Sequence, residues 1–207
     1  MSAPARIGVL ALQGGVAEHI RLLEALGAQA LAVRSPAGLE QELDGLILPG
    51  GESSTVDRLL RRFEMRERLQ QLLQDGLPVL GTCAGLILLA DRVLDPAPDQ
   101  SGLGILDITV RRNAFGRQLA SSTQTMTSEL GAVTGAFIRA PEVIGTGPGV
   151  RVLARRGGAP DGDGPIVAVR AGAAVGLSFH PELTGETAFH RDLLHRALQR
   201  RRAAQHA

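Results

Sequence analysis

The chain has 207 residues, of which 44% are hydrophobic and 21% charged, and its formal net charge is +1. This composition predicts a folded chain with a substantial core, and the length fits a single domain over residues 1–207. A net charge close to zero argues against nucleic acid or a membrane surface as a partner. The longest apolar runs also fall far short of the ~20 residues that a membrane helix needs.

The basic residues are all arginine, because the sequence contains no lysine. Such a chain cannot form a side-chain imine with an aldehyde, and it has no Walker lysine for a nucleotide. The absence of tryptophan and tyrosine removes most platforms on which single-stranded nucleic acid stacks. One cysteine and no recognisable signal peptide are typical of the reducing cytoplasm, where we expect the protein to act.

In the first half of the chain, short apolar segments alternate with amphipathic ones, which is typical of a mostly parallel α/β sheet flanked by helices. Strands are predicted there at residues 7–12, 30–33, 46–48 and 78–80, and helices at residues 16–26, at 56–74 and directly after Cys83. The second half indicates strands and hairpins, at residues 108–110, 136–138, 150–153, 166–169 and 174–179. A last helix is expected at residues 186–199, followed by a frayed tail at about residues 200–207.

The segment around residue 83 is the most informative in the sequence. A short apolar strand runs into Gly81-Thr-Cys83-Ala-Gly85 and then into the apolar start of a helix. This order is typical of a nucleophile elbow, with cysteine in the place of serine. The glycines allow the sharp turn, which is expected to hold the thiol exposed at a helix N-terminus, where a thiolate is favoured. Most lone cysteines are inert core residues, but this glycine frame favours a nucleophile at Cys83.

A histidine and a glutamate stand close together late in the chain, as His180-Pro181-Glu182, where an apolar strand ends. Side chains at i and i+2 of a strand point to the same side, so the imidazole can lie between a thiol and a carboxylate that fixes its tautomer. A histidine and a glutamate at this spacing are, by themselves, a weak motif. In the order Cys83, His180, Glu182 they predict a triad for nucleophilic acyl transfer.

A glycine pair, Gly50-Gly51, follows the predicted strand at residues 46–48 and precedes a predicted helix start. Glycine amides at such a turn can serve as oxyanion-hole donors, and Gly51 would then act together with the N–H of Ala84. The rival interpretation is a phosphate cradle. It has little support, because neither Gly-Lys-Ser/Thr nor G-x-G-x-x-G is present.

The remaining histidines are interpreted as surface residues. His190 and His195 are five residues apart on the last predicted helix, which is a poor geometry for a shared metal, and a solvated face is expected for both. His19 is expected on the surface or at the cap of its helix. We predict no metal site and no cofactor.

The elbow, the glycine pair and the His-Pro-Glu segment together resemble the class I, triad-type glutamine amidotransferases. Further segments narrow the resemblance to the glutaminase subunits of pyridoxal 5′-phosphate synthases, and they lie in order at residues 8–19, 48–53, 81–86, 112–118, 137–141 and 178–184. The resemblance implies an α/β, flavodoxin-like class I amidotransferase fold with an antiparallel strand and hairpin extension in the C-terminal half. It covers nearly the whole chain, but it is weakest at residues 119–130.

The resemblance also implies an activity and a partner. The activity is hydrolysis of L-glutamine to L-glutamate and ammonia through a cysteine thioester, and the partner is a synthase subunit that receives the ammonia. Cys83 matches the nucleophile, His180 the general base and acid, and Glu182 the residue that orients the histidine. Glutamine-binding positions match Gly51, Glu52, Ser53, Arg112, Ile138 and Arg139, while Gly51 and Ala84 match the oxyanion hole.

Two alternatives remain open. One is the glutaminase of another amidotransferase, such as imidazole glycerol phosphate synthase, against which the segments at residues 112–118 and 137–141 argue. The other is a non-catalytic module of the same fold that only binds a partner or glutamine. The presence of Cys83, His180 and Glu182 argues against this second alternative.

Overall fold

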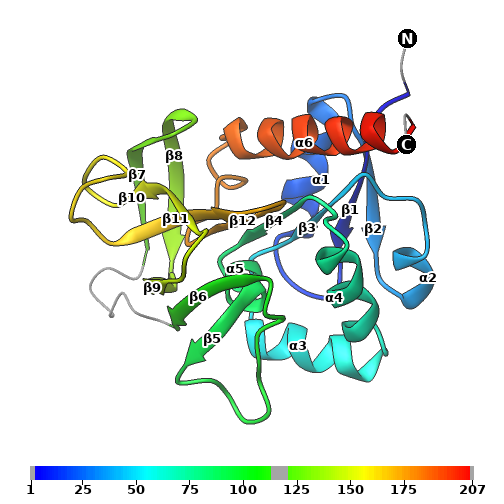
Figure 1. Ribbon diagram of the computed structural model, residues 1–207, viewed down its shortest axis with the longest axis horizontal. Helices are drawn as coiled ribbons and strands as arrows, with labels where there is room; N and C mark the ends of the chain where they lie inside the picture. The colour runs from blue at the N-terminus through cyan, green and yellow to red at the C-terminus, as the bar shows by residue number, and fades with distance from the viewer. Residues whose placement is uncertain (1–2, 113–120, 206–207) are drawn as a thin grey trace.

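A computed structural model of the chain describes residues 3–112 and 121–205. Its centre is a mixed sheet whose strands follow the order β2-β1-β3-β4-β12-β11-β10-β7-β8 (Figure 1). The strands from β2 to β12 in this order run parallel, with the bounds β1 Arg6–Leu10, β2 Gln29–Val33, β3 Gly45–Leu48, β4 Val79–Thr82 and β12 Ala174–Leu177. The predicted parallel centre of the sheet is therefore confirmed.

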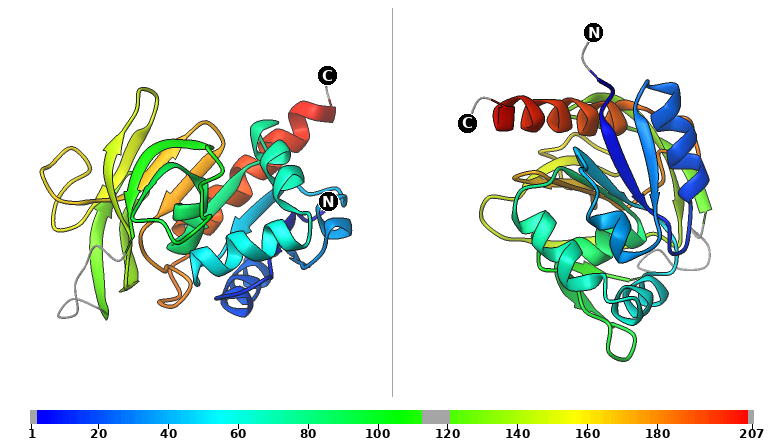
Figure 2. Two further views of the ribbon diagram at one scale, coloured as in Figure 1. Left: turned by 90° about the horizontal axis from the view of Figure 1, so that it is seen from below. Right: turned by 90° about the vertical axis from the view of Figure 1, so that its right-hand side faces the viewer.

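Helices cover both faces of the parallel strands, as Figures 1 and 2 show. One face carries α1 (Val16–Ala25) and α6 (Ala188–Gln205), and the other carries α3 (Ser53–Arg62), α4 (Arg66–Gln74) and α5 (Ala84–Leu89), with the short α2 (Pro36–Leu39) beside β2. None of the described helices is long and apolar enough to cross a bilayer.

Each buried strand supplies side chains to two cores. In β3, Leu46 and Leu48 pack with the α3–α5 side, whereas Ile47 between them packs with the α1 and α6 side. This alternation is the period of two that every strand imposes. It explains why a parallel strand with helices on both faces reads as a continuous apolar run in the sequence.

The second half of the chain extends the sheet mainly with antiparallel strands. They are β6 (Leu106–Arg111), β7 (Ser121–Ser128), β8 (Gly131–Ile138), β9 (Glu142–Thr146), β10 (Arg151–Arg155) and β11 (Ile166–Ala171), while β5 (Ala90–Leu94) pairs with β6 in parallel. The predicted hairpin extension is confirmed. Residues 113–118, part of one segment that carries the resemblance, lie outside the described residues.

Two elements differ from the sequence prediction. The helix predicted over residues 56–74 is two helices, because Glu64 adopts a positive φ of 56° between α3 and α4. Neither glycine nor proline marks this break in the sequence. The predicted frayed tail is wrong for residues 200–205, because α6 continues to Gln205. Arg201 fastens it by donating to the carboxylate of Asp44 at 3.2 Å and to the carbonyl of Pro4 at 3.1 Å.

Candidate active site

Cys83 stands at the sharp turn between β4 and α5, with backbone angles of φ 48° and ψ −99°. A non-glycine residue at positive φ is strained, so the surroundings must hold it in place. A Cβ on Gly81 would lie 2.7 Å from the carbonyl of Gly85, and a Cβ on Gly85 would overlap the carbonyl oxygen of Leu48. Close backbone packing therefore requires both glycines, as the elbow pattern predicts.

The thiol is less accessible than expected from the sequence. Cys83 is only 7% exposed, so the expectation of an exposed thiol is wrong. The side chain instead forms part of the lining of a pocket. The Cys83 N–H donates to the carbonyl of Leu177 at 2.7 Å, which fixes the elbow against the strand that leads to His180.

His180 and Glu182 lie shortly after the end of β12 at Leu177. The backbone of His180 exchanges two hydrogen bonds with Ala136 of β8, at 2.8 and 3.1 Å, which fixes the start of this segment. The imidazole Nδ1 lies 2.7 Å from Oε1 of Glu182, whose side chain is fully buried. With Nδ1–H donating to the carboxylate, Nε2 is left to face the thiol.

The surroundings of His180 favour its protonated form. Burial of the imidazole lowers its pKa, but hydrogen bonds and charge interactions with Cys83 and Glu182 outweigh burial and raise the pKa to about 10. A histidine that interacts with both a thiol and a carboxylate has the arrangement of an acid–base residue in a triad. The structure thus brings together Cys83, His180 and Glu182.

The glycine pair lies beside this triad. The Gly50 N–H donates to Oγ1 of Thr82 at 2.9 Å, and the Gly50 carbonyl accepts from the N–H of Gly15 at 3.0 Å. The described residues contain no cis peptide bond, so the N–H of Gly51 points away from Gly15. Ala84, the other predicted oxyanion donor, is the first residue of α5, where backbone N–H groups lack helical partners.

One pocket contains every glutamine-binding residue predicted from the sequence, together with the thiol. It is lined by Gly51, Glu52, Ser53, Cys83, Ile87, Arg112, Ile138 and Arg139. Ile87 was not predicted, although its place one helical turn after Cys83 on α5 is a usable signal. The pocket has a volume of ≈ 30 Å³, well below the ~300–1,000 Å³ that is typical of small-molecule sites.

Two of the pocket residues form an ion pair. Arg112 donates to Oε1 of Glu52 at 3.1 Å and to Oε1 of Gln100 at 2.7 Å. Gln100 in turn donates to Oγ of the buried Ser53 at 2.9 Å. Gln100, which was not predicted from the sequence, therefore links two of the residues that line the pocket.

Arg139 differs from Arg112 in both its backbone and its partners. It lies directly after β8 with a positive φ of 44° and is exposed at the pocket. Within the part of the chain that the structure describes, no carboxylate pairs with it. Such a guanidinium is suited to a carboxylate that arrives with a ligand.

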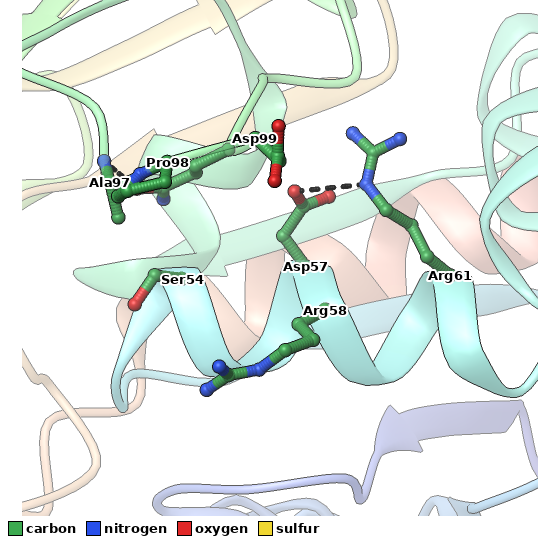
Figure 3. A pocket seen from close by; sticks show the side chains of 8 residues that line it. Ser54, Asp57, Arg58, Arg61, Ala97, Pro98 and Asp99 are labelled. Carbon is green, nitrogen blue, oxygen red and sulfur yellow. Dashed lines mark hydrogen bonds and ion pairs between the residues drawn. The ribbon is translucent and has the colours of Figure 1, made fainter.

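A larger cavity of ≈ 410 Å³ lies between α3 and the loop after β5 (Figure 3). Asp57 of α3 accepts from Nε of Arg61 at 3.2 Å and pairs with the buried Arg66. Arg66 also donates to the carbonyl of Gly102 at 2.6 Å. This network anchors the loop that carries Gln100.

Two histidines expected on the surface are buried. His19 and His190 both have no exposed surface, so the surface interpretation is wrong for them. They contact each other through Nδ1 of His19 and Nε2 of His190, at 2.9 Å. His195 is exposed and contacts Gln199 at 2.7 Å. In residues 3–112 and 121–205, no group of His, Cys, Asp and Glu side chains could hold a metal ion.

Comparisons with known proteins identify the family of the chain. Residues 9–199 match the SNO glutamine amidotransferase family. The chain is 58% identical over 197 residues to the pyridoxal 5′-phosphate synthase subunit PdxT of Kineococcus radiotolerans, covering 92% of this chain and 94% of that protein. It is 51% identical to the subunit of the same name from Rhodococcus jostii over 192 residues, with coverage of 89% and 93%.

A solved structure confirms the predicted fold class. The crystal structure of a glutamine amidotransferase superimposes with a TM-score of 0.84 at 43% sequence identity, covering 92% of this chain and 98% of that chain. The family model and the solved structure therefore agree over most of the chain. The chain belongs to the SNO glutamine amidotransferase family.

Proposed function

We propose that this protein is the glutaminase subunit of a pyridoxal 5′-phosphate synthase. It hydrolyses L-glutamine to L-glutamate and ammonia, and the ammonia passes to a synthase subunit. The observation that carries the proposal is that Cys83 lines a pocket together with the predicted glutamine-binding residues and interacts with His180, which in turn contacts Glu182. The names of relatives at 51–58% identity give the process that the ammonia serves.

The reaction begins with attack of the Cys83 thiolate on the side-chain carboxamide carbon of glutamine. His180, held protonated between Cys83 and Glu182, gives its proton to the departing ammonia, and a thioester remains. The neutral imidazole then takes a proton from water, which attacks the thioester and releases glutamate. Glu182 holds the imidazole orientation throughout, because its carboxylate accepts from Nδ1 at 2.7 Å.

The negative oxygen that forms in both steps requires donors. Ala84 at the start of α5 and Gly51 in the glycine pair supply their N–H groups. Donors of this kind contribute roughly 3–4 kcal/mol each to the transition state. Because both residues of the Gly50-Gly51 peptide are glycine, this peptide can turn without a side-chain clash, so the Gly51 donor can be presented when the partner docks.

The two arginines that line the pocket, Arg112 and Arg139, have different roles in glutamine recognition. Arg139 receives the α-carboxylate, because no described carboxylate pairs with it and it borders the pocket. Arg112 positions Glu52 through the 3.1 Å ion pair, and the half-exposed Glu52 carboxylate suits the α-ammonium group. Gly51 and Ser53 close the wall beside the carboxamide, and Ile138 covers the opening.

The synthase subunit is expected to control the reaction. The pocket is too small to admit glutamine without movement of its walls, and docking of a partner on the exposed rim at Ile138 and Arg139 would supply that movement. The chain has no lysine, so any imine chemistry of the synthase occurs on the partner. We place the single domain and its complex in the cytoplasm.

Glutamate release measured with and without a lysine-bearing synthase subunit tests this function. Strong stimulation by the subunit is expected, because the pocket of the chain alone is too small for glutamine. Cys83→Ser is the matched control, and it should show no glutamate release in either condition. Equal rates with and without the subunit would contradict the proposed coupling, and a full rate in Cys83→Ser would contradict the proposed chemistry.

A further inference from the structure

A series of buried polar groups lies next to Glu182, and none of them is among the residues that line the glutamine pocket. Nε2 of His190 lies 2.9 Å from Nδ1 of His19, and Nε2 of His19 lies 3.3 Å from Oγ1 of Thr82. The same Oγ1 accepts the N–H of Gly50 at 2.9 Å. The contacts therefore run from α6 through α1 and the end of β4 to the glycine pair.

This series of groups also meets the triad. Nε2 of His19 lies 3.6 Å from Oε1 of Glu182, the oxygen that accepts from His180, and both side chains are fully buried. Oε2 of Glu182 has no hydrogen-bond partner among the described residues. A buried carboxylate with one strong hydrogen bond is costly, so the polarity of its next neighbour matters.

Both buried histidines are neutral at physiological pH. Burial, then the nearby His190 and His180, lower the pKa of His19 well below its ordinary value. Burial lowers the pKa of His190 to about 4, although Glu186 opposes the shift. A neutral imidazole has one donor nitrogen and one acceptor nitrogen, so the geometry decides which nitrogen of His19 carries the proton.

The position of the Glu182 carboxylate favours the proton on Nε2 of His19. With that tautomer, an N–H dipole faces the carboxylate, whereas the other tautomer would turn a lone pair toward a negative oxygen. Nδ1 of His19 is then an acceptor, and His190 supplies the N–H across the 2.9 Å contact.

We propose that His19 is a positioning residue for the glutaminase reaction: its neutral Nε2–H faces Oε1 of the buried Glu182 carboxylate, the oxygen that also accepts from His180. Through Thr82 the same ring is linked to Gly50, so the carboxylate and the glycine pair are held by one group. This inference rests on the proposed glutaminase function and adds a residue that does not touch glutamine. His190 acts one step further back, by fixing the tautomer.

The test compares His19→Gln with His19→Met in the complex with the synthase subunit. Glutamine and methionine have similar size and shape, but only glutamine keeps an N–H donor near the position of Nε2. Loss of the donor is expected to lower kcat about tenfold or more, since an N–H dipole that faces a buried charge acts in a surrounding of low dielectric. His19→Gln should recover most of that loss, and KM for glutamine should stay close to the wild-type value in both variants.

A purely structural role predicts a different pattern. In that case the two variants would lose activity equally, and the loss would follow a drop in melting temperature. Full activity of His19→Met would also overturn the inference. If the wild-type complex itself released no glutamate in a Cys83-dependent way, the proposed function would fail instead, so the two failures are distinguishable.

The variants His190→Gln and His190→Met repeat the comparison at the second buried histidine. They replace the first pair of variants if the protein does not fold with a substitution at residue 19. Only glutamine can still donate toward Nδ1 of His19, so His190→Met should lower kcat more than His190→Gln does. His195→Met is the control on the same helix, because His195 is exposed and should leave kcat unchanged. Equal kcat values in the two His190 variants would contradict the assigned tautomer.

Discussion

Gly50 lies directly against the imidazole of His180: a Cβ on Gly50 would overlap the Cε1 atom of that ring. The glycine pair and the acid–base residue therefore occupy adjoining space. Glycine is therefore needed at this position if the imidazole of His180 is to keep its observed place.

Gly50→Ala is expected to displace the His180 ring and lower glutaminase activity by about a hundredfold or more, as losses at triad positions do. Glutamate release in the complex with the synthase subunit measures the effect. Gly158→Ala is the matched control, because a Cβ there meets nothing within 4 Å, and it should keep full activity. Full activity of Gly50→Ala would mean that His180 does not need its observed position.

Cys83→Ala is expected to abolish glutamate release and to leave the fold intact. The thiol is buried but lines the pocket, so its removal enlarges a cavity that already exists. Glutamine should still bind, which isothermal titration in the complex would detect. The positive φ of 48° at this position gives alanine no new strain, since cysteine already has a Cβ. Residual turnover above a small fraction of wild type would contradict a thioester mechanism.

Glu182→Gln is expected to lower kcat by orders of magnitude with little change in KM, because the carboxylate contacts His180 and not the pocket. The amide retains the shape but loses the charge that raises the pKa of His180. The pH profile of kcat/KM should therefore shift in this variant. An unchanged kcat would exclude Glu182 from the triad.

Acid should destabilise the protein through its buried neutral histidines. The pKa of His190 is lowered from 6.5 to about 4, so the unfolded chain binds the proton more tightly than the folded chain. Its contribution to stability is complete above about pH 6.5 and is lost as the pH falls toward 4, and it amounts to about 3 kcal/mol over that window. The lowered pKa of His19 acts in the same direction.

Chemical unfolding at pH 7 and pH 5 measures this effect. His190→Leu should lose less stability than wild type between the two pH values, whereas His195→Leu should follow wild type. Comparison between variants cancels the contributions of the other titrating groups. Identical losses in all three proteins would show that His190 does not titrate with the expected shift.

The parallel strands, the elbow and the pocket residues could be predicted from the sequence, because each leaves a local pattern or a segment of high specificity. The burial of His190 was missed because histidine was treated as a polar residue, which is expected on the surface. Its place on α6, however, shares a helical face with Leu193 and Ala197, which are both fully buried. The same holds for His19, which stands one turn before the buried Leu23 on α1.

Strand β7 could not be predicted from the sequence, for a different reason. Its sequence is rich in serine and threonine, and only Met126 and Ser128 are buried. Pairing with β8 along its whole length holds it in place, and that pairing is a tertiary contact with no local apolar signal. The break at Glu64 likewise depends on how α3 and α4 pack, since tertiary packing overrides helix propensity.

The central claim is that Cys83 is the nucleophile of a glutamine site. Intact-protein mass spectrometry, after treatment of the complex with a glutamine-like diazoketone, tests it most directly. We predict one covalent adduct per chain, located on Cys83 by peptide mapping, absent in Cys83→Ala and suppressed by excess glutamine. An adduct that persists in Cys83→Ala, or labelling of Cys83 that glutamine does not suppress, would contradict the assigned site.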